Sequence, residues 1–216
     1  MRRVVLTVLG LTLLPSLALA QAGVENCFSC ILGIFDDIGV QNPSGTINPF
    51  ELKEIYLGIV LPPGQDGVTS LELSIAGLPG SAEALVTLEG VEPFSADLGS
   101  TINAPPDTSI AGDESSPYGK VYGWSTCLSG TRALVKISIF PFAAVAPNTV
   151  YEVKRRYPST YPPVRSPLII GCDAPTYTAY RVSAGCYVAN PSGGPLPVCT
   201  TAVQPATWTG VKQLFR

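Results

Sequence analysis

Tyrosine and arginine side chains gather in one part of the sequence, between residues 151 and 187. Six of the nine tyrosines lie there, interleaved with one lysine and four arginines. A tyrosine combines an apolar ring with a polar hydroxyl, so it suits stacking on a sugar ring or anchoring a protein, and an arginine adds recognition of carboxylate or sulfate groups. The residues predicted to form a binding face are Tyr151, Arg155, Arg156, Tyr157, Tyr161, Arg165, Tyr177, Tyr180 and Arg181. The alternative is that the tyrosines cover strand faces and the ends of a sandwich, with the basic residues solvated.

Groups that carry common catalytic chemistry are scarce. The chain has no histidine, which excludes Ser-His-Asp and Cys-His catalysis as well as histidine-ligated metals. Two pairs of adjacent carboxylates, Asp36/Asp37 and Asp113/Glu114, would point to opposite faces of a strand, so they are predicted to be turn and loop residues rather than the paired acids of a glycosidase. The sequence also lacks a calcium loop and a phosphate-binding glycine motif. We therefore expect no catalytic residues, no metal and no cofactor.

The cysteines indicate an oxidising compartment. Their number is even, and they are Cys27, Cys30, Cys127, Cys172, Cys186 and Cys199. In an exported protein such a set implies disulfides, although sequence alone does not choose the pairing. The expected pairs are Cys27–Cys30, Cys127–Cys172 and Cys186–Cys199. A redox role for the first pair is the alternative, but no strand of a βαβ unit precedes it.

The N-terminus has the pattern of a signal peptide. Arg2 and Arg3 precede an apolar run over residues 4–14, and residues 18–20 form an Ala-x-Ala cleavage signal. A retained membrane anchor is the alternative, although the apolar run is short for a membrane span. We predict that residues 1–20 are removed and that the mature chain, which holds no predicted span, is secreted or placed on the cell surface.

Charge is sparse and unevenly distributed. Only 13% of the residues are charged, against about 25% in ordinary globular chains, and the net charge is negative, so no nucleic-acid partner is expected. Residues 21–119 hold 14 acidic residues and only Lys53, whereas residues 120–216 hold 10 basic residues against Glu152 and Asp173. Either strands from the two halves interleave and neutralise each other, or the molecule is dipolar and associates head to tail with its own kind.

Short strand-like segments alternate with Gly and Pro turns along the whole chain. The clearest is 68–75, in which Leu71, Leu73 and Ile75 share one face while Glu72 and Ser74 lie on the other, so it is predicted to be a half-buried strand. Residues 41–48 and 99–119 are predicted loops. Eight or more strands at this spacing predict an all-β fold, an antiparallel β-sandwich with long loops over residues 21–205.

The last residues, 206–216, are predicted to form a short C-terminal helix. Apolar side chains fall on one face of this segment, which either docks on the sandwich or serves as a recognition signal. Its residues of interest are Trp208, Val211, Lys212, Leu214, Phe215 and Arg216.

Four segments of the chain resemble a family of uncharacterised secreted bacterial proteins. They are 32–36, 68–79, Cys172-Asp-Ala-Pro-Thr-Tyr-Thr178 and 207–216, and the most specific are the C-D-A-P segment and the T-W-x-x-V-K-x-L-[YF]-R ending. The central part, Gly67-Val-Thr-Ser-Leu-Glu-Leu and Ala133-Leu-Val-Lys-Ile-Ser-Ile, is more weakly similar to cohesin-like and other immunoglobulin-like sandwiches. These resemblances imply an immunoglobulin-like or cohesin-like architecture and export, but no reaction. Dockerin binding is not implied, because Ala76-Gly-Leu-Pro79 stands where a cohesin has a Tyr-Asp-Pro-like turn.

The leading hypothesis is a secreted, non-enzymatic β-sandwich protein for extracellular binding or cell-surface structure, with an extracellular protein or a glycan as partner. A carbohydrate-binding module that uses the Tyr/Arg face is the alternative. A glycosidase-type enzyme is the third hypothesis.

Overall fold

The described part of the chain consists of β-strands and their connections. The computed structural model describes residues 24–105, 117–160 and 166–193, and within these ranges it contains no helix that is long and apolar enough to cross a membrane. The strands are β1 (Glu25–Phe35), β2 (Ser44–Gly45), β3 (Lys53–Val60), β4 (Val68–Ala76), β5 (Ala84–Gly90), β6 (Ala96–Gly99), β7 (Lys120–Leu128), β8 (Arg132–Pro141), β9 (Thr149–Lys154), β10 (Leu168–Gly171), β11 (Ala179–Ala184) and β12 (Cys186–Ala189).

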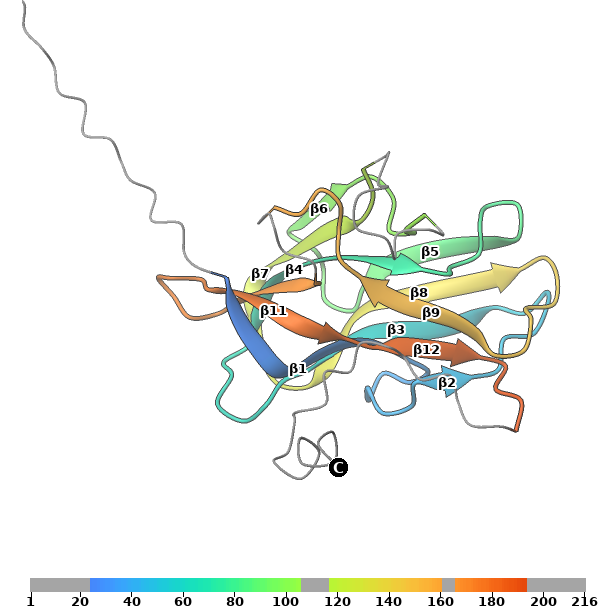
Figure 1. Cartoon of the computed structure of the whole chain (residues 1–216), viewed down its shortest axis with the longest axis horizontal. Coiled ribbons are helices and arrows are strands. Elements are labelled where there is room, and N and C mark those ends of the chain that lie inside the picture. The colour runs from blue at the N-terminus through green and yellow to red at the C-terminus, as the bar shows by residue number, and fades with distance from the viewer. Residues whose placement is uncertain (1–23, 106–116, 161–165, 194–216) are drawn as a thin grey trace, which may run out of the picture.

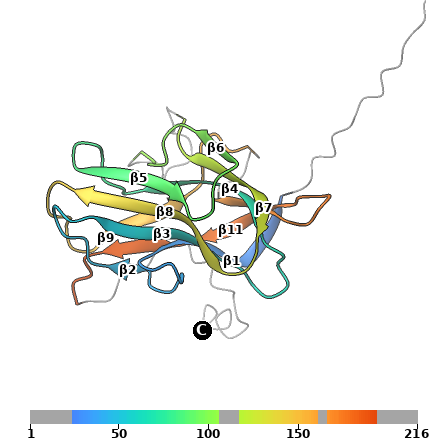
Figure 2. The ribbon, with the colours of Figure 1, turned by 180° about the vertical axis from the view of Figure 1, so that it is seen from behind.

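Hydrogen bonding joins these strands in one continuous path that folds back on itself. The order is β2-β12-β9-β4-β10-β11-β1-β3-β8-β5, and β7 pairs with β4 and β6 beside this path. β9 and β12 lie in front of β8 and β3 in Figure 1, and the order is reversed in the view from behind in Figure 2. The molecule is therefore a two-layered β-sandwich, in which one layer holds β2, β12, β9 and β4 and the other holds β1, β3, β8 and β5.

The core lies between these layers and follows from the alternation of apolar residues. Ile55, Leu57 and Ile59 of β3 face inward, as do Val135, Ile137 and Ile139 of β8, and every one of them has no measurable exposure. Leu71, Leu73 and Ile75 of β4 close the core from the other layer with at most 1% exposure. Burial of each such side chain stabilises the fold by roughly 1.5–3 kcal/mol. The apolar residues whose alternation predicts the strands are therefore also the residues that hold the two layers together.

The expectation of an all-β sandwich is confirmed, with two differences in strand pairing. β1 runs parallel to β11, and β2 runs parallel to β12, whereas all other pairs are antiparallel. β2 falls in the predicted loop 41–48, where a two-residue strand gives no periodic signal. Residues 102–104 of the predicted loop 99–119 are bonded to β4, because Ile75 accepts a hydrogen bond from Ala104 (2.8 Å) and donates one to Ile102 (2.8 Å).

The charges of the two halves of the chain meet within the fold. Lys136 of β8 contacts Glu89 (2.8 Å) and Glu54 (3.4 Å), and Arg132 contacts Glu92 at 2.9 Å. Lys120 likewise contacts Asp97 at 3.0 Å, and Arg156 lies 3.7 Å from Glu72. Strands of the acidic and basic halves therefore interleave, as the first of the two charge interpretations predicts. The predicted C-terminal helix over 206–216 lies outside the described residues.

Candidate functional site

Two of the tyrosines between 151 and 187 belong to the core. The side chains of Tyr151 and Tyr187 are 1% and 0% exposed, and their rings stack with centroids 6.0 Å apart at an interplanar angle of 15°. Tyr187 donates a hydrogen bond of 2.7 Å to Asp36, which also pairs with Lys53 at 2.6 Å. The assignment of Tyr151 to an exposed binding face is therefore wrong, because its position in β9 directs the ring between the two layers.

The outer face of β4 is covered, contrary to the prediction of a half-buried strand. The connection that follows β9 crosses this face, and we call its residues 155–160 the strap. Ser74 Oγ donates to the backbone oxygen of Arg155 at 2.6 Å. Glu72 accepts a hydrogen bond from Ser159 Oγ (2.6 Å) and lies within reach of the Thr160 N–H (3.0 Å). Since a buried polar group needs partners, these contacts explain how Glu72 and Ser74 are accommodated at 6% and 0% exposure.

The strap carries three of the residues predicted for the binding face. Tyr157 exchanges two backbone hydrogen bonds with Tyr118 (2.8 and 2.9 Å), and the two rings stack at 6.0 Å. The guanidinium of Arg155 lies over the Tyr157 ring, 5.6 Å from its centroid. Arg156 turns toward Glu72, as described above. Tyr157, Arg155 and Arg156 are all half-buried, so none of the three side chains is fully open to solvent.

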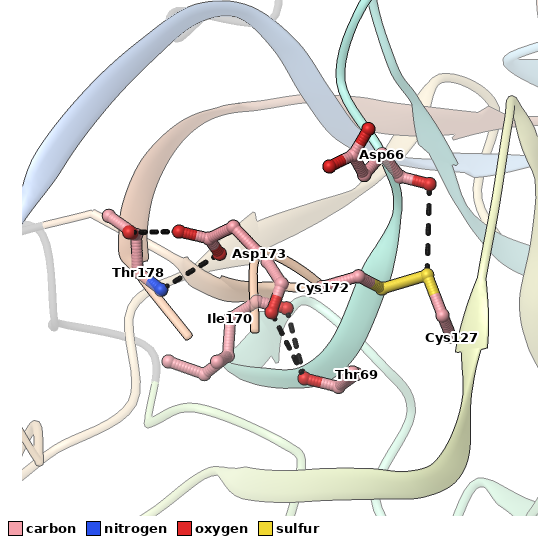
Figure 3. The surroundings of a disulfide bond; sticks show 8 residues. Asp66, Thr69, Cys127, Ile170, Cys172, Asp173 and Thr178 are labelled. Carbon is pink, nitrogen blue, oxygen red and sulfur yellow. Dashed lines mark hydrogen bonds between the residues drawn. A yellow bond between two sulfur atoms is a disulfide. The ribbon is translucent and has the colours of Figure 1, made fainter. Parts of the chain in front are cut away.

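The C-D-A-P segment lies in the connection between β10 and β11, residues 172–178, which we call the corner loop. This loop lies at one end of the sandwich (Figure 1), and its contacts are shown in Figure 3. Asp173 accepts hydrogen bonds from Thr176 Oγ1 (2.9 Å), from the Thr178 N–H (2.9 Å) and from Thr178 Oγ1. These hydrogen bonds lower the pKa of Asp173, and the hydrogen bond from the Thr178 side chain has the largest effect. Asp173, Thr176 and Thr178 therefore hold the turn that links β10 to β11.

The predicted binding residues are spread over the molecule. Tyr177 stands on the corner loop with 51% exposure, and Tyr180 packs against the core. Arg181 is exposed on β11 and lies in the same cross-strand row as Glu72, with Leu168 between them. Tyr161 and Arg165 lie outside the described residues. The structure thus brings Arg155, Arg156 and Tyr157 together and separates them from Tyr177.

Two of the expected disulfides are present. Cys27 pairs with Cys30, and Cys127 of β7 pairs with Cys172 of the corner loop. Cys186 is disulfide-bonded as well, while its expected partner Cys199 lies outside the described residues.

The acidic pair at residues 36 and 37 has structural contacts. Asp36 is held by Tyr187 and Lys53, and Asp37 accepts hydrogen bonds from the backbone and side-chain nitrogens of Asn42 at 2.9 and 3.0 Å. The Asn42 N–H is the main reason that the pKa of Asp37 is lowered. Both carboxylates thus stabilise the turn after β1, and the second predicted pair, Asp113/Glu114, lies outside the described residues.

A patch of apolar side chains, four of them exposed and one half-buried, lies where β8 ends and β3 and β5 begin, and sequence reasoning missed it. Its residues are Phe50, Leu52, Leu85, Phe140 and Phe142, which we call the apolar patch. Leu85 and Phe140 are directly opposite in the β5–β8 pair and face outward, because Val86 and Ile139 beside them face the core. Phe140 and Phe142 are 6.2 Å apart, and the Phe50 N–H donates to the backbone oxygen of Pro141 at 2.8 Å, which draws the patch together.

The concentration of exposed apolar surface in this patch is unusual for the molecule. Seven large hydrophobic side chains of the described residues are highly exposed, and four of them, Phe50, Leu52, Leu85 and Phe142, belong to the patch with exposures of 44% to 67%. Single exposed apolar residues are ordinary, but contiguous ones mark binding surfaces. The patch is therefore the best candidate functional site.

Carboxylates border the apolar patch. Glu51 and Glu83 flank it, and neither forms a salt bridge with any residue that the structure describes. Further along the same outer face, Glu54 and Glu89 share Lys136, which leaves an excess of negative charge there. The surface thus combines an apolar centre with an acidic border.

Comparison with known proteins finds likeness at the level of structure alone. No protein-family model and no curated protein matches the chain. Among solved structures, it is similar to a cohesin module from a family 33 glycoside hydrolase of Clostridium perfringens, with 12% identity, a TM-score of 0.42 and coverage of 74% of this chain and 98% of that one. It is also similar to a type III cohesin module from a cell-surface anchoring scaffoldin of Ruminococcus flavefaciens, with 15% identity, a TM-score of 0.37 and coverage of 82% and 93%. A non-cellulosomal cohesin from Archaeoglobus fulgidus gives 12% identity, a TM-score of 0.37 and coverage of 74% and 91%. The identities and TM-scores of these matches are low, so the sandwich fold is assigned from the strand pairing of this chain.

One local signal in the sequence could have drawn attention to Leu85, although it does not reveal the rest of the apolar patch. Along β5, Leu85 alternates with the apolar positions Ala84, Val86 and Leu88 and shares a face with Thr87 and Glu89. An apolar residue on a polar face of a strand has no core to enter. Phe142 follows the last residue of β8, and only the fold brings it near Leu85.

Proposed function

We propose that this chain is a secreted, non-enzymatic module that binds a protein partner outside the cell through the apolar patch. The observation that carries the proposal is the gathering of Phe50, Leu52, Leu85 and Phe142 on one surface while large apolar side chains elsewhere in the described residues are mostly buried. Aromatic side chains are enriched at protein interfaces, and burying them supplies the driving force of association. The predicted removal of residues 1–20 and the disulfides agree with an extracellular setting.

The acidic border indicates the character of the partner. A surface with glutamates around an apolar centre is complemented by an apolar segment flanked by lysines or arginines. Complementary charge mainly steers the encounter and selects the partner, while the aromatic centre contributes most of the affinity. The proposed partner is therefore a protein with a basic border around an apolar anchor.

A peptide-display selection on the purified protein tests this proposal. We expect enriched peptides to combine apolar and basic residues, and to lose binding at least ten-fold when Leu85→Asp places a charge in the centre of the apolar patch. Leu98→Asp is the matched control, because it makes the same substitution at a 61% exposed position on β6, outside the patch. Selected peptides that bind the two variants equally would refute the assignment of this surface.

Carbohydrate binding is the second candidate function, and one observation favours it. Tyr177 is 51% exposed on the corner loop, and Arg181 is exposed on the following strand, so an aromatic ring and a basic group lie close in sequence and open to solvent. A glycan array tests this alternative. Binding that Tyr177→Ala abolishes would support it, and no signal above background would count against it.

A further inference from the structure

A pocket of about 300 Å³ opens beside the apolar patch. One wall comes from the connection between β4 and β5, with Gly77, Pro79 and Glu83, and the other from residues 141–151 that join β8 to β9. The Phe142 N–H donates to the backbone oxygen of Glu83 at 2.8 Å, so the pocket and the patch share a boundary. Its volume is at the lower limit of ligand-binding pockets, which suits a single side chain.

The wall over residues 141–151 is held in place by Asn190. This side chain accepts a hydrogen bond from the Ile47 N–H (2.7 Å) and donates to the backbone oxygens of Val145 (2.9 Å) and Ile47 (3.2 Å). Asn148 adds two side-chain hydrogen bonds to Ser192, of 2.7 and 3.0 Å. The pocket therefore exists before any partner arrives, and preorganisation of this kind lowers the entropy cost of binding.

Gly77 defines the opposite wall. Its φ is +86°, in the region that favours glycine, and a Cβ at this position would overlap the backbone oxygen of Val150. The connection can therefore pass close to β9 only because residue 77 has no side chain.

The pocket is lined mostly by apolar side chains, with the hydroxyl-bearing Thr149 and Tyr151 and one carboxylate among them. Ala143, Ala144, Val145 and Ala146 provide short apolar side chains, and Glu83 is the one acidic residue among those that line it. One carboxylate oxygen of Glu83 accepts the Gly80 N–H at 2.9 Å, which fixes the group and leaves the other oxygen available. Burial, with a contribution from the Glu83 carboxylate, raises the pKa of Tyr151 to about 12, so this tyrosine is neutral at physiological pH.

Resting on the proposed function, we propose that the pocket receives the side chain of a lysine from the protein partner. Its methylenes would contact the alanines and prolines, and its ammonium would pair with Glu83. A lysine fits better than an arginine, because the planar guanidinium is best matched by a carboxylate with both oxygens free, whereas an ammonium acts as a compact point charge. An anionic side chain is disfavoured by the charge of Glu83.

Amide NMR of the full-length protein with n-butylammonium as a probe tests this proposal without the partner. We expect saturable shifts at Gly77, Glu83 and residues 143–146 with n-butylammonium, and at least ten-fold weaker binding of its neutral isostere n-butanol. Glu83→Gln keeps an oxygen that accepts the Gly80 N–H but removes the charge, so it should weaken n-butylammonium binding at least ten-fold. Glu25→Gln removes a charge from an exposed position on β1, outside the pocket and the acidic border, and should leave the affinity unchanged.

Equal affinities for n-butylammonium and n-butanol would overturn the proposal. The absence of chemical-shift changes at these residues would overturn it too, as would an equal loss of n-butylammonium affinity in the two glutamine variants. Failure of this proposal is distinguishable from failure of the proposed function. If n-butylammonium binds as expected while no partner engages the apolar patch, the proposed function fails. If a partner engages the patch while the pocket ignores the ammonium, only the lysine site fails.

Discussion

The hydroxyl of Ser159 donates a hydrogen bond of 2.6 Å to Glu72, a carboxylate that is 6% exposed and lies 87 residues earlier in the chain. The Thr160 N–H approaches the same carboxylate to 3.0 Å, and Arg156 lies 3.7 Å away. A buried carboxylate is tolerated only when hydrogen bonds and nearby charge offset its desolvation. Glu72 therefore fixes the strap across the outer face of β4.

Replacing this carboxylate tests its structural role. Glu72→Gln keeps the shape of the side chain but puts an NH2 group near the donors on the strap, so we expect a loss of about 1–3 kcal/mol in the free energy of unfolding, measured with urea. Glu89→Gln is the control, because the Glu89 side chain is 70% exposed in its pair with Lys136 and exposed pairs contribute little to stability. Losses of equal size in the two variants would contradict the account of the strap.

The Cys127–Cys172 disulfide links residues 45 positions apart, whereas Cys27–Cys30 links residues 3 positions apart. Loop-closure entropy makes the first bond the stronger constraint on the unfolded chain, with a contribution of about 4 kcal/mol against roughly 1.6 kcal/mol for the second. We therefore expect the paired replacement Cys127→Ala with Cys172→Ala to lower the melting temperature more than Cys27→Ala with Cys30→Ala. Calorimetry of the two double variants provides the comparison, and the reverse order would show that the corner is not braced by this bond.

Asp173 gives the corner a dependence on pH. Because hydrogen bonds favour its ionised form, its pKa in the folded protein lies below the ordinary value of 3.8. A depressed folded-state pKa adds stability that is present above pH 3.8 and disappears as the pH falls through the lower folded value.

Asp173→Asn should therefore lower the melting temperature by a few degrees at neutral pH, since one or two hydrogen bonds of a charged group are lost. The difference from the wild-type protein should narrow below pH 3.8. Thermal unfolding across a pH series measures both effects. A difference that is constant over the whole pH range would mean that the charge of Asp173 has no part in it.

The alternation within each strand was enough to predict which side chains enter the core, and Leu71, Leu73 and Ile75 are found where it places them. The same alternation predicted the wrong environment for Glu72 and Ser74. Nothing local to 68–75 shows that a segment more than 80 residues later covers its outer face. The parallel pairing of β1 with β11 escaped prediction for the same reason, since pairing between distant strands leaves no local period.

The tyrosines show where composition misleads. Their clustering in the sequence predicted one binding face, yet β9 sends Tyr151 inward between its neighbours Val150 and Glu152, and the corner loop carries Tyr177 away from the strap. In contrast, the apolar patch gathers residues from three separate segments, 50–52, 85 and 140–142. Such a site becomes visible only when the fold is known.

Photo-crosslinking from within the apolar patch tests the proposed function most directly. Benzoylphenylalanine in place of Phe142 samples the patch, and in place of Tyr177 it samples an aromatic position of similar exposure, 51% against 44%, on the corner loop at the opposite end of the sandwich (Figure 1). In the culture that produces the protein, we predict a discrete protein adduct from position 142, several-fold more abundant than any adduct from position 177 and suppressed by Leu85→Asp in the same chain. Equal yields from the two positions, or an adduct from position 177 alone, would contradict a binding site at the apolar patch.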